Sequence, residues 1–501
     1  MGGFPLVMVT IGMMTVVFLV ALDHYILAQA VPRITTDFNS LEDAAWYSSG
    51  YFLTSMAMQP AFGQIYTYFS VKYIYMLSVL FFEAGSIVCA LAPSSTALIL
   101  GRLITGVGGG GLYIGTVVLV GYVVPVNKRP IYISIVSSLD GAASVAGPLL
   151  GGVFTNSYLT WRFCFWVNLP IGFIAIMLMT IFFRDLPKRS ETTLPLKAKL
   201  AKINYLSIVL LLGSFTMLLL ALQWAGPVYV WTDPHVLGCL VGAGVVLAGY
   251  LYYQYYLGDK AAIPYRILAQ RTVFSSAAFM LLIAMVIGVG IYYLPFYFQA
   301  VLGTSAQTSG IENLPFLVSL MFSPLISGFL ISWLGHYVPF MYFGAILSAV
   351  GSGLLATFSV STPKANIIAF QFIAGLGAGI SHQIPYTSVQ FSLPSSEMVL
   401  GSALVSFLNC LGTILGIVAA QAVFGGVLIG KLDGIPNVDA GVVFRAGPTN
   451  VANAVPEPLV SIVRSAYGVA LQKTFILPTV LSCLCCICCL KMEWKRLKAS
   501  K

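Results

Sequence analysis

The side chains best placed to do chemistry in this sequence are isolated charges inside long apolar segments. Arg102 lies in the apolar stretch 97–124, within a glycine-rich run over 101–111. An arginine at the centre of a bilayer costs roughly 2.5 kcal/mol or more. At helical spacing it shares one face with small and aromatic residues that leave a groove for a neighbouring helix, namely Gly106, Gly109 and Tyr113. We predict that Arg102 binds an anion or steers a proton; a side chain that reaches the membrane interface is the alternative.

Three acidic residues also fall inside apolar segments. Asp23 lies in the first segment, Glu83 in the third and Asp140 in the fifth. Low-dielectric surroundings favour the neutral form of a carboxyl group, so such a group can bind and release a proton near neutral pH. We predict that Asp23, Glu83 and Asp140 act with Arg102 in proton coupling. Hydrogen bonds that only join helices are the alternative for each carboxyl group.

The segment that begins at Asp140 also carries a pattern of small residues. Gly147 and Gly151 lie one helical turn apart, which permits close helix crossing. Pro148 removes a backbone donor, so the helix can bend there. A generic packing face is the alternative. The residues predicted to act in conformational change are Gly106, Gly147, Pro148, Gly151 and Gly152.

The composition places these charges in a membrane. Of the 501 residues, 58% are hydrophobic and 8% are charged, whereas a soluble domain carries about 25% charged residues. The net charge of +9 does not indicate a nucleic-acid partner, because the basic residues cluster beside apolar segments. The sequence shows no nucleotide-binding loop, nucleophile triad or metal-ligand pattern. We therefore expect a multi-pass membrane protein that is not an enzyme and holds neither a metal nor a cofactor.

Fourteen apolar segments are long enough to cross a bilayer. Because the number is even, both chain ends lie on one side, and the loops on that side carry most of the Lys and Arg residues. We therefore predict an all-α polytopic protein with both termini in the cytoplasm. The segments are 5–31, 44–69, 72–92, 97–124, 130–157, 162–184, 203–223, 235–256, 272–301, 308–332, 338–359, 364–391, 398–428 and 471–490.

A short internal repeat links two of these segments. Residues 372–379 match residues 103–110, an alignment that places Gln371 opposite Arg102. Two similar halves with a site between them are how secondary transporters are built. Coincidence is the alternative, since both runs are short and rich in glycine.

The motifs occur in the order seen in a known family. The chain resembles the fourteen-helix drug:proton antiporter branch of the major facilitator superfamily, and more closely the fungal toxin and secondary-metabolite efflux pumps. It departs from the family where Tyr25 replaces the usual Thr, where the loop 63–72 lacks an Asp and an Arg, and at Asp140, which lies outside the family motifs. The matching segments, spread over nearly the whole chain, are 22–32, 63–72, 82–86, 89–93, 101–111, 147–152, 161–172, 293–299 and 305–310.

The resemblance implies a major facilitator fold of two six-helix bundles and two inserted helices. Residues 1–184 would form the first bundle, and 185–271 a cytosolic linker followed by the inserted helices. Residues 272–490 would form the second bundle, including an extracytoplasmic loop at about 429–470, and 491–501 a basic cytosolic tail.

The resemblance also implies two further sets of functional residues. Gly63 and Lys72 would belong to a cytoplasmic loop motif between the second and third helices. The second set would line the substrate pathway and contains Gln59, Tyr293, Phe296, Gln299, Gln383, Tyr386 and Asn409. Ordinary packing is the alternative for its aromatic members.

The implied function is proton-coupled efflux of a toxin, drug or secondary metabolite by alternating access. The partners would be a small organic substrate, protons and the lipid bilayer, and the protein would act as a monomer in the plasma membrane. Proton-coupled uptake or vacuolar transport of a solute, such as a siderophore or a basic amino acid, is one alternative. A receptor that uses a transporter fold to bind a ligand without moving it is another.

Overall fold

The computed structural model describes residues 3–40, 43–183, 194–224, 232–394, 397–433, 435–436, 438–446, 455–494 and 496. Within these residues all regular structure is helical. The long helices are α1 (Phe4–Phe38), α2 (Ala44–Tyr68), α3 (Val71–Ala90), α4 (Ser95–Val123), α5 (Arg129–Asn156), α7 (Asn168–Phe182), α9 (Tyr205–Trp224), α10 (Pro234–Leu257), α12 (Arg271–Phe296), α14 (Leu314–Leu334), α15 (Val338–Leu355), α16 (Lys364–His382), α18 (Met398–Leu432) and α21 (Val460–Leu490). Shorter helices are η2 (Val126–Lys128), α6 (Phe163–Trp166), α8 (Leu196–Ala201), η4 (Gly258–Lys260), α11 (Tyr265–Leu268), η5 (Tyr297–Val301), α13 (Ala306–Glu312), α17 (Ile384–Ser392), α19 (Ala440–Ala446) and η6 (Glu457–Leu459).

The predicted all-α membrane fold is confirmed. In the part of the chain that is described, thirteen helices are long and apolar enough to cross a membrane. The predicted segment that is missing from these thirteen is α2, which is 25 residues long. Several of its polar residues, including Thr54, Gln59 and Gln64, are buried. They are accommodated because α2 packs against α4, α9 and α18 inside the protein.

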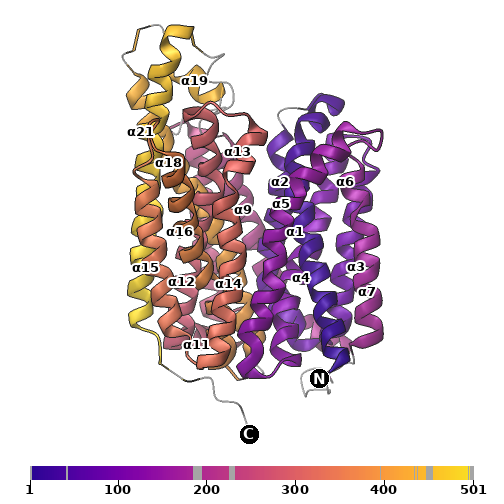
Figure 1. Ribbon diagram of the computed structural model, residues 1–501. Coiled ribbons are helices and arrows are strands. Elements are labelled where there is room, and N and C mark those ends of the chain that lie inside the picture. The colour runs from indigo at the N-terminus through magenta and orange to yellow at the C-terminus, as the bar shows by residue number, and fades with distance from the viewer. Residues whose placement is uncertain are drawn as a thin grey trace.

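The helices form two groups that stand side by side (Figure 1). The N-terminal half contains α1 to α7, and the C-terminal half contains α12 to α21. The halves meet where α5 packs on α14 and α2 packs on α18. Helix α1 begins and α21 ends at the same end of the molecule, here called the terminal end (Figure 1). The division into domains at the predicted boundaries stays a prediction, and the linker residues 185–193 lie outside the described residues.

Close contacts join the two halves toward the terminal end. Nε2 of Gln390 in α17 donates to the carbonyl oxygen of Val117 in α4 at 2.8 Å. Nη1 of Arg129, at the start of α5, donates to the carbonyl oxygen of Gln390 at 3.2 Å. A Cβ atom added at Gly63 in α2 would lie 2.8 Å from Cβ of Ala403 in α18, so these helices also touch closely. These contacts hold the halves together at this level.

Helix α9 lies against α2 of the N-terminal half and α18 of the C-terminal half, and α10 packs on α9. Nε2 of Gln223 donates to Oγ of Ser49 in α2 at 2.7 Å. The aromatic ring of Phe215 lies 5.9 Å from that of Phe407 in α18. Helix α9 is therefore hydrogen-bonded to the N-terminal half and in apolar contact with the C-terminal half.

The region 429–470, expected to be a long loop, is partly helical. Helix α18 continues to Leu432, α19 covers part of the connection, and α21 begins at Val460. The additional turns of α21 form because Val463 and Tyr467 bury their side chains against the C-terminal half. The hydroxyl group of Tyr467 also donates to the carbonyl oxygen of Val443 in α19 at 3.3 Å.

Candidate functional site

A buried ion pair joins α1 to α4. Nη1 of Arg102 lies 2.5 Å from Oδ2 of Asp23, and neither side chain is exposed to solvent. Nε of Arg102 donates to the carbonyl oxygen of Tyr47 in α2 at 2.8 Å. The guanidinium group also lies 4.9 Å from the ring centroid of Tyr51, in cation–π geometry. The structure therefore brings two of the predicted residues together, and the complete burial of Arg102 does not fit a side chain that reaches the interface.

The glycines of α4 allow this arrangement to form. A Cβ atom at Gly106 would overlap the Tyr51 carbonyl group and the Thr54 hydroxyl group in α2. A Cβ atom at Gly108 would lie 2.5 Å from the backbone nitrogen of Phe82 in α3. Only glycine lets the α4 backbone approach both neighbours this closely. This close packing of the helices allows Nε of Arg102 to reach the carbonyl oxygen of Tyr47 in α2.

Asn168 completes the buried cluster and was not predicted. Its Nδ2 atom donates to Oδ1 of Asp23 at 2.8 Å and to Oγ of Ser86 at 3.1 Å. Asn168 is fully buried at the start of α7. Each carboxylate oxygen of Asp23 therefore has a partner. A polar side chain in an apolar segment is the same signal that identified Arg102, and it could have identified Asn168 as well.

Glu83 lies outside these hydrogen bonds. Its side chain in α3 is 9% exposed, and neither carboxyl oxygen has a hydrogen-bond partner. A Cβ atom at Gly172 in α7 would overlap the Glu83 carboxyl group, so this group packs directly on the α7 backbone. Its participation in proton coupling stays a prediction.

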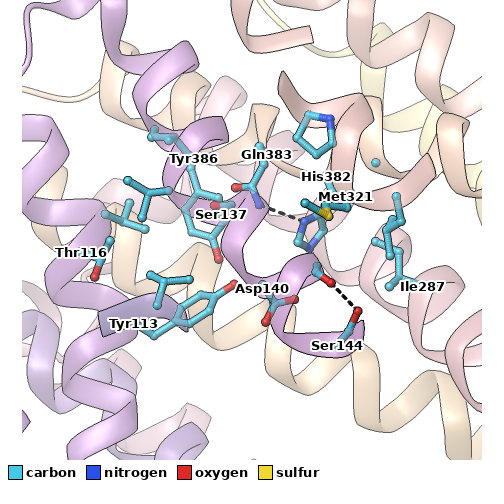
Figure 2. A pocket seen from close by; sticks show the side chains of 18 of the residues that line it. Tyr113, Thr116, Ser137, Asp140, Ser144, Ile287, Met321, His382, Gln383 and Tyr386 are labelled. Atoms are coloured by element: carbon cyan, nitrogen blue, oxygen red, sulfur yellow. Dashed lines mark hydrogen bonds between the residues drawn. The ribbon is translucent and has the colours of Figure 1, made fainter. Parts of the chain in front are cut away.

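A cavity of about 110 Å³ lies between the halves, with room for several water molecules. Helices α1, α4 and α5 form one wall, and α12, α14, α16 and α17 form the other (Figure 2). Asp140 projects into this cavity from α5 and is exposed within it. Its hydrogen-bond partner is Tyr25 of α1. Asp140 supplies the only Asp, Glu, Lys or Arg side chain among the residues that line the cavity in the described part of the chain.

A chain of hydrogen bonds crosses from the N-terminal half to the opposite wall. Nδ2 of Asn409 in α18 donates to the hydroxyl oxygen of Tyr113 in α4 at 3.2 Å. Oδ1 of Asn409 lies 3.0 Å from Nε2 of His382, and Nδ1 of His382 lies 3.3 Å from Nε2 of Gln383. Gln383 and His382 line the cavity together with Tyr386, whereas Asn409 stands behind the lining. His382 was not predicted, because a single histidine at a helix end has no distinctive pattern.

Five of the seven predicted pathway residues lie outside the lining of this cavity, namely Asn409, whose contacts are given above, and the four described next. Tyr293 and Phe296 pack on Phe424 within the C-terminal half, with ring centroids 5.6 and 5.8 Å away. Nε2 of Gln299 donates to Oγ of Ser309 at 3.3 Å. Nε2 of Gln59 lies 3.2 Å from Sγ of Cys410, across the boundary between the halves. In this structure the two aromatic residues fit the packing alternative.

The small residues of α5 face α1. A Cβ atom at Gly147 would lie 2.5 Å from Cβ of Tyr25, and one at Gly151 would lie 2.5 Å from the carbonyl oxygen of Ile26. Pro148 is inside the same helix. A Cβ atom at Gly152 would meet nothing within 4 Å. Gly147 and Gly151 thus set the distance between the backbones of α1 and α5, and Gly152 does not.

The two residues of the predicted loop motif make different contacts. Gly63 is the point of close contact between α2 and α18 described above. Nζ of Lys72 donates to the carbonyl oxygens of Thr180 and Phe183, at 3.0 and 2.5 Å. These carbonyl groups belong to the end of α7, so Lys72 caps that helix from α3.

The internal repeat is matched by equivalent contacts. A Cβ atom at Gly375 would overlap the Phe316 carbonyl and Ser319 hydroxyl groups of α14, just as one at Gly106 would overlap Tyr51 and Thr54 of α2. Nε2 of Gln371 donates to the carbonyl oxygen of Glu312 at 3.1 Å. Glu312 stands four residues before Phe316, as Tyr47 stands four residues before Tyr51. Gln371 therefore takes the place of Arg102 in the second half, without its charge.

Two helical halves of related structure around a cavity are the architecture of a secondary transporter. Residues 13–417 match the model of the Major Facilitator Superfamily, and the chain belongs to this superfamily. The predicted family is thereby confirmed, as is the prediction of a transporter rather than an enzyme.

Similar proteins come from fungi. The chain is 39% identical over 500 residues to the MFS-type efflux pump MFS1 of Arthroderma benhamiae (strain ATCC MYA-4681 / CBS 112371), covering 100% of this chain and 93% of that protein. It is 38% identical over 500 residues to the efflux pump hmp6 of Hypomyces subiculosus, covering 99% and 88%. Among solved structures, the proton:xylose symporter XylE has a TM-score of 0.59 at 14% identity, with 98% of this chain and 97% of that chain covered. The human organic anion transporter MFSD10 has a TM-score of 0.58 at 13% identity, with 96% and 100% covered.

Proposed function

We propose that this transporter exports a toxin, drug or secondary metabolite in exchange for protons. The observation that carries the proposal is the position of Asp140, an acidic group exposed in a cavity that both halves line. A carboxyl group there can hold a proton or face a substrate, as antiport requires. The relatives that are named efflux pumps support export rather than uptake.

Helix α1 connects the two acidic sites. Asp23 pairs with Arg102 in α4, and two residues later Tyr25 bonds to Asp140 in α5. Because Gly147 and Gly151 keep α1 and α5 in backbone contact, a movement of α5 would shift α1 as well. If protonation of Asp140 moves α5, it would thus also move Asp23 of α1 relative to Arg102. In this proposal Asp140 exchanges the proton, and Arg102 with Asp23 transmits its state.

The proposal includes the energy source, the membrane, the orientation and the oligomeric state of the transporter. The proton gradient supplies the energy, so the transporter needs no bound cofactor. The terminal end faces the cytoplasm, the membrane is the plasma membrane, and the protein works as a monomer. In the structure the contacts of Gln390 and Arg129 hold the halves together at the terminal end, which would correspond to a state closed toward the cytoplasm.

Transport in sealed inside-out vesicles tests the proposal. With an imposed pH gradient and a panel of lipophilic metabolites, we expect accumulation that a protonophore abolishes. Asp140→Asn should lose the dependence on the gradient. Asp259→Asn is the matched control, because the Asp259 side chain is 78% exposed in the short helix η4 and does not line the cavity. Gradient-independent accumulation by the wild type, or unchanged coupling in Asp140→Asn, would contradict the proposal.

A further inference from the structure

The cavity wall of the C-terminal half offers a histidine at a break between two helices. Helix α16 ends at His382, Gln383 follows, and α17 begins at Ile384 with Pro385 in its first turn. The His382 side chain lines the cavity (Figure 2) and is half-buried. The ring of His382 therefore borders the cavity and also contacts Asn409 of α18.

The direction of the hydrogen bonds fixes which imidazole nitrogen carries hydrogen. Asn409 donates through Nδ2 to Tyr113, so its Oδ1 atom is the acceptor that faces His382. Nε2 of His382 therefore carries the hydrogen, and the lone pair of Nδ1 accepts from Nε2 of Gln383. At 3.3 Å, the contact between this lone pair and the amide of Gln383 is longer than the 3.0 Å and 3.2 Å contacts of Asn409. Nδ1 is thus the atom that can most easily accept a hydrogen bond from a bound molecule.

A second polar atom on the same wall lacks a well-formed hydrogen bond. The hydroxyl group of Tyr386 lies near Tyr113, Ser406 and Asn409, but none of them meets it in hydrogen-bond geometry, and the side chain is only 1% exposed. Tyr386 and His382 both line the cavity, on either side of the break between α16 and α17. Figure 2 shows the hydroxyl group of Tyr386 directed into the space that Tyr113 and Asp140 also face. A buried hydroxyl group without a well-formed hydrogen bond is costly, so a ligand acceptor would satisfy it.

The rest of the lining limits the charge and shape of the ligand. The cavity has no Lys or Arg side chain among its described lining residues, and it has one acidic group, Asp140. An anionic ligand would therefore meet no fixed positive charge there. The walls between the polar groups are apolar and include Ile287, Leu317 and Met321, which suits a ring system.

We propose that His382 and Tyr386 form the recognition site for an uncharged, ring-rich cargo that carries a free phenol or enol hydroxyl group and a carbonyl group. The cargo hydroxyl group donates to Nδ1 of His382 in place of the Gln383 amide, and the hydroxyl group of Tyr386 donates to the cargo carbonyl oxygen. Asn409 is a positioning residue that fixes the hydrogen on Nε2. The inference rests on the proposed export function and names the cargo class of its cavity.

Equilibrium binding to the purified full-length protein in detergent tests this assignment without any proton gradient. The probes are 2-hydroxyanthraquinone, 2-methoxyanthraquinone and anthraquinone-2-carboxylate at pH 6. We expect the hydroxyl probe to bind about tenfold more tightly than the methoxy probe, because methylation removes the donor. The carboxylate should bind more weakly than both. These comparisons use the wild-type protein, so they do not depend on the folding of a variant.

Variants separate the two groups. His382→Leu should reduce the difference between the hydroxyl and methoxy probes to within about twofold, whereas Tyr386→Phe should weaken both probes by a similar factor and keep the difference. His336→Leu, which changes a histidine between α14 and α15 outside the cavity lining, is the matched control and should change neither. Equal binding of the two probes by the wild type, tight binding of the carboxylate, or discrimination that survives in His382→Leu would overturn the proposal. Absence of binding by all three probes would overturn it too, while gradient-driven export of other metabolites in vesicles would leave the proposed function standing.

Discussion

The buried pair of Arg102 and Asp23 gives the sharpest prediction. In Arg102→Ala the Asp23 carboxylate keeps its bond from Asn168 but loses its counter-charge at 2.5 Å. Removing one partner of a buried ion pair typically costs about 3–5 kcal/mol, because the other charge stays buried without compensation. We therefore expect the free energy of unfolding of Arg102→Ala to fall by about this amount.

The double variant Arg102→Ala/Asp23→Asn provides the decisive comparison. A neutral amide at position 23 can still bond to Asn168, and no uncompensated charge remains. We expect the double variant to recover a large part of the stability that the single variant loses, so the two changes are not additive. Proton-coupled transport should be lost in both variants, since neither keeps the ion pair that transmits the protonation state of Asp140 in the proposed function.

Denaturant unfolding of the protein in mixed micelles is the assay. The matched control is Arg33→Ala, which removes an arginine from an exposed pair with Asp37 on α1. Such surface pairs contribute about 0–1 kcal/mol, so this variant should differ little from the wild type. If Arg102→Ala were as stable as Arg33→Ala, or if the double variant were less stable than the single one, the reasoning would be refuted.

Three further predictions concern the contacts between helices. Gly147→Val should abolish transport because its side chain would overlap α1, whereas Gly152→Ala should transport normally; equal flux in vesicles would contradict this. Gln390→Leu loses the bond to α4, so hydrogen exchange at the terminal ends of α4 and α5 should become faster while the middle of α3 stays protected; an unchanged exchange rate there would count against the contact. Lys72→Met should speed amide exchange in the last turn of α7, because two carbonyl groups lose their donor; exchange at the wild-type rate would show that the cap is unimportant.

The parts of the site that could be predicted are those in which a polar group must find a partner. Arg102 and Asp23 stand out in the sequence because an unpaired charge in an apolar segment is costly, and the structure pairs them. The small residues Gly106 and Gly147 stand out because close helix contact needs them. Asn168 obeys the same logic, but an amide is a weaker signal than a charge.

Whether a side chain points into the cavity or packs within one half could not be predicted in the same way. Tyr293 and Tyr386 look alike in the sequence, yet only Tyr386 lines the cavity. In helices that are apolar all round, periodicity does not tell a cavity wall from a packing face. His382 depends on a helix break that places its ring beside Asn409 of a different helix, and such long-range pairing leaves no local pattern.

The attachment of α9 would make the two halves unequal if they move as the proposed function requires. Two hydrogen bonds attach it to α2, from Gln223 to Ser49 at one end and from the backbone of Asn204, the residue before α9, to Gln64 at the other, over 2.7 and 3.0 Å. Toward α18 it presents the ring of Phe215, which can slide on Phe407 without breaking a polar bond. When the halves tilt, α9 and the attached α10 would travel with the N-terminal half. That half would displace more lipid per cycle than the C-terminal half. The stiffness and thickness of the surrounding bilayer should therefore affect the movement of the N-terminal half more strongly.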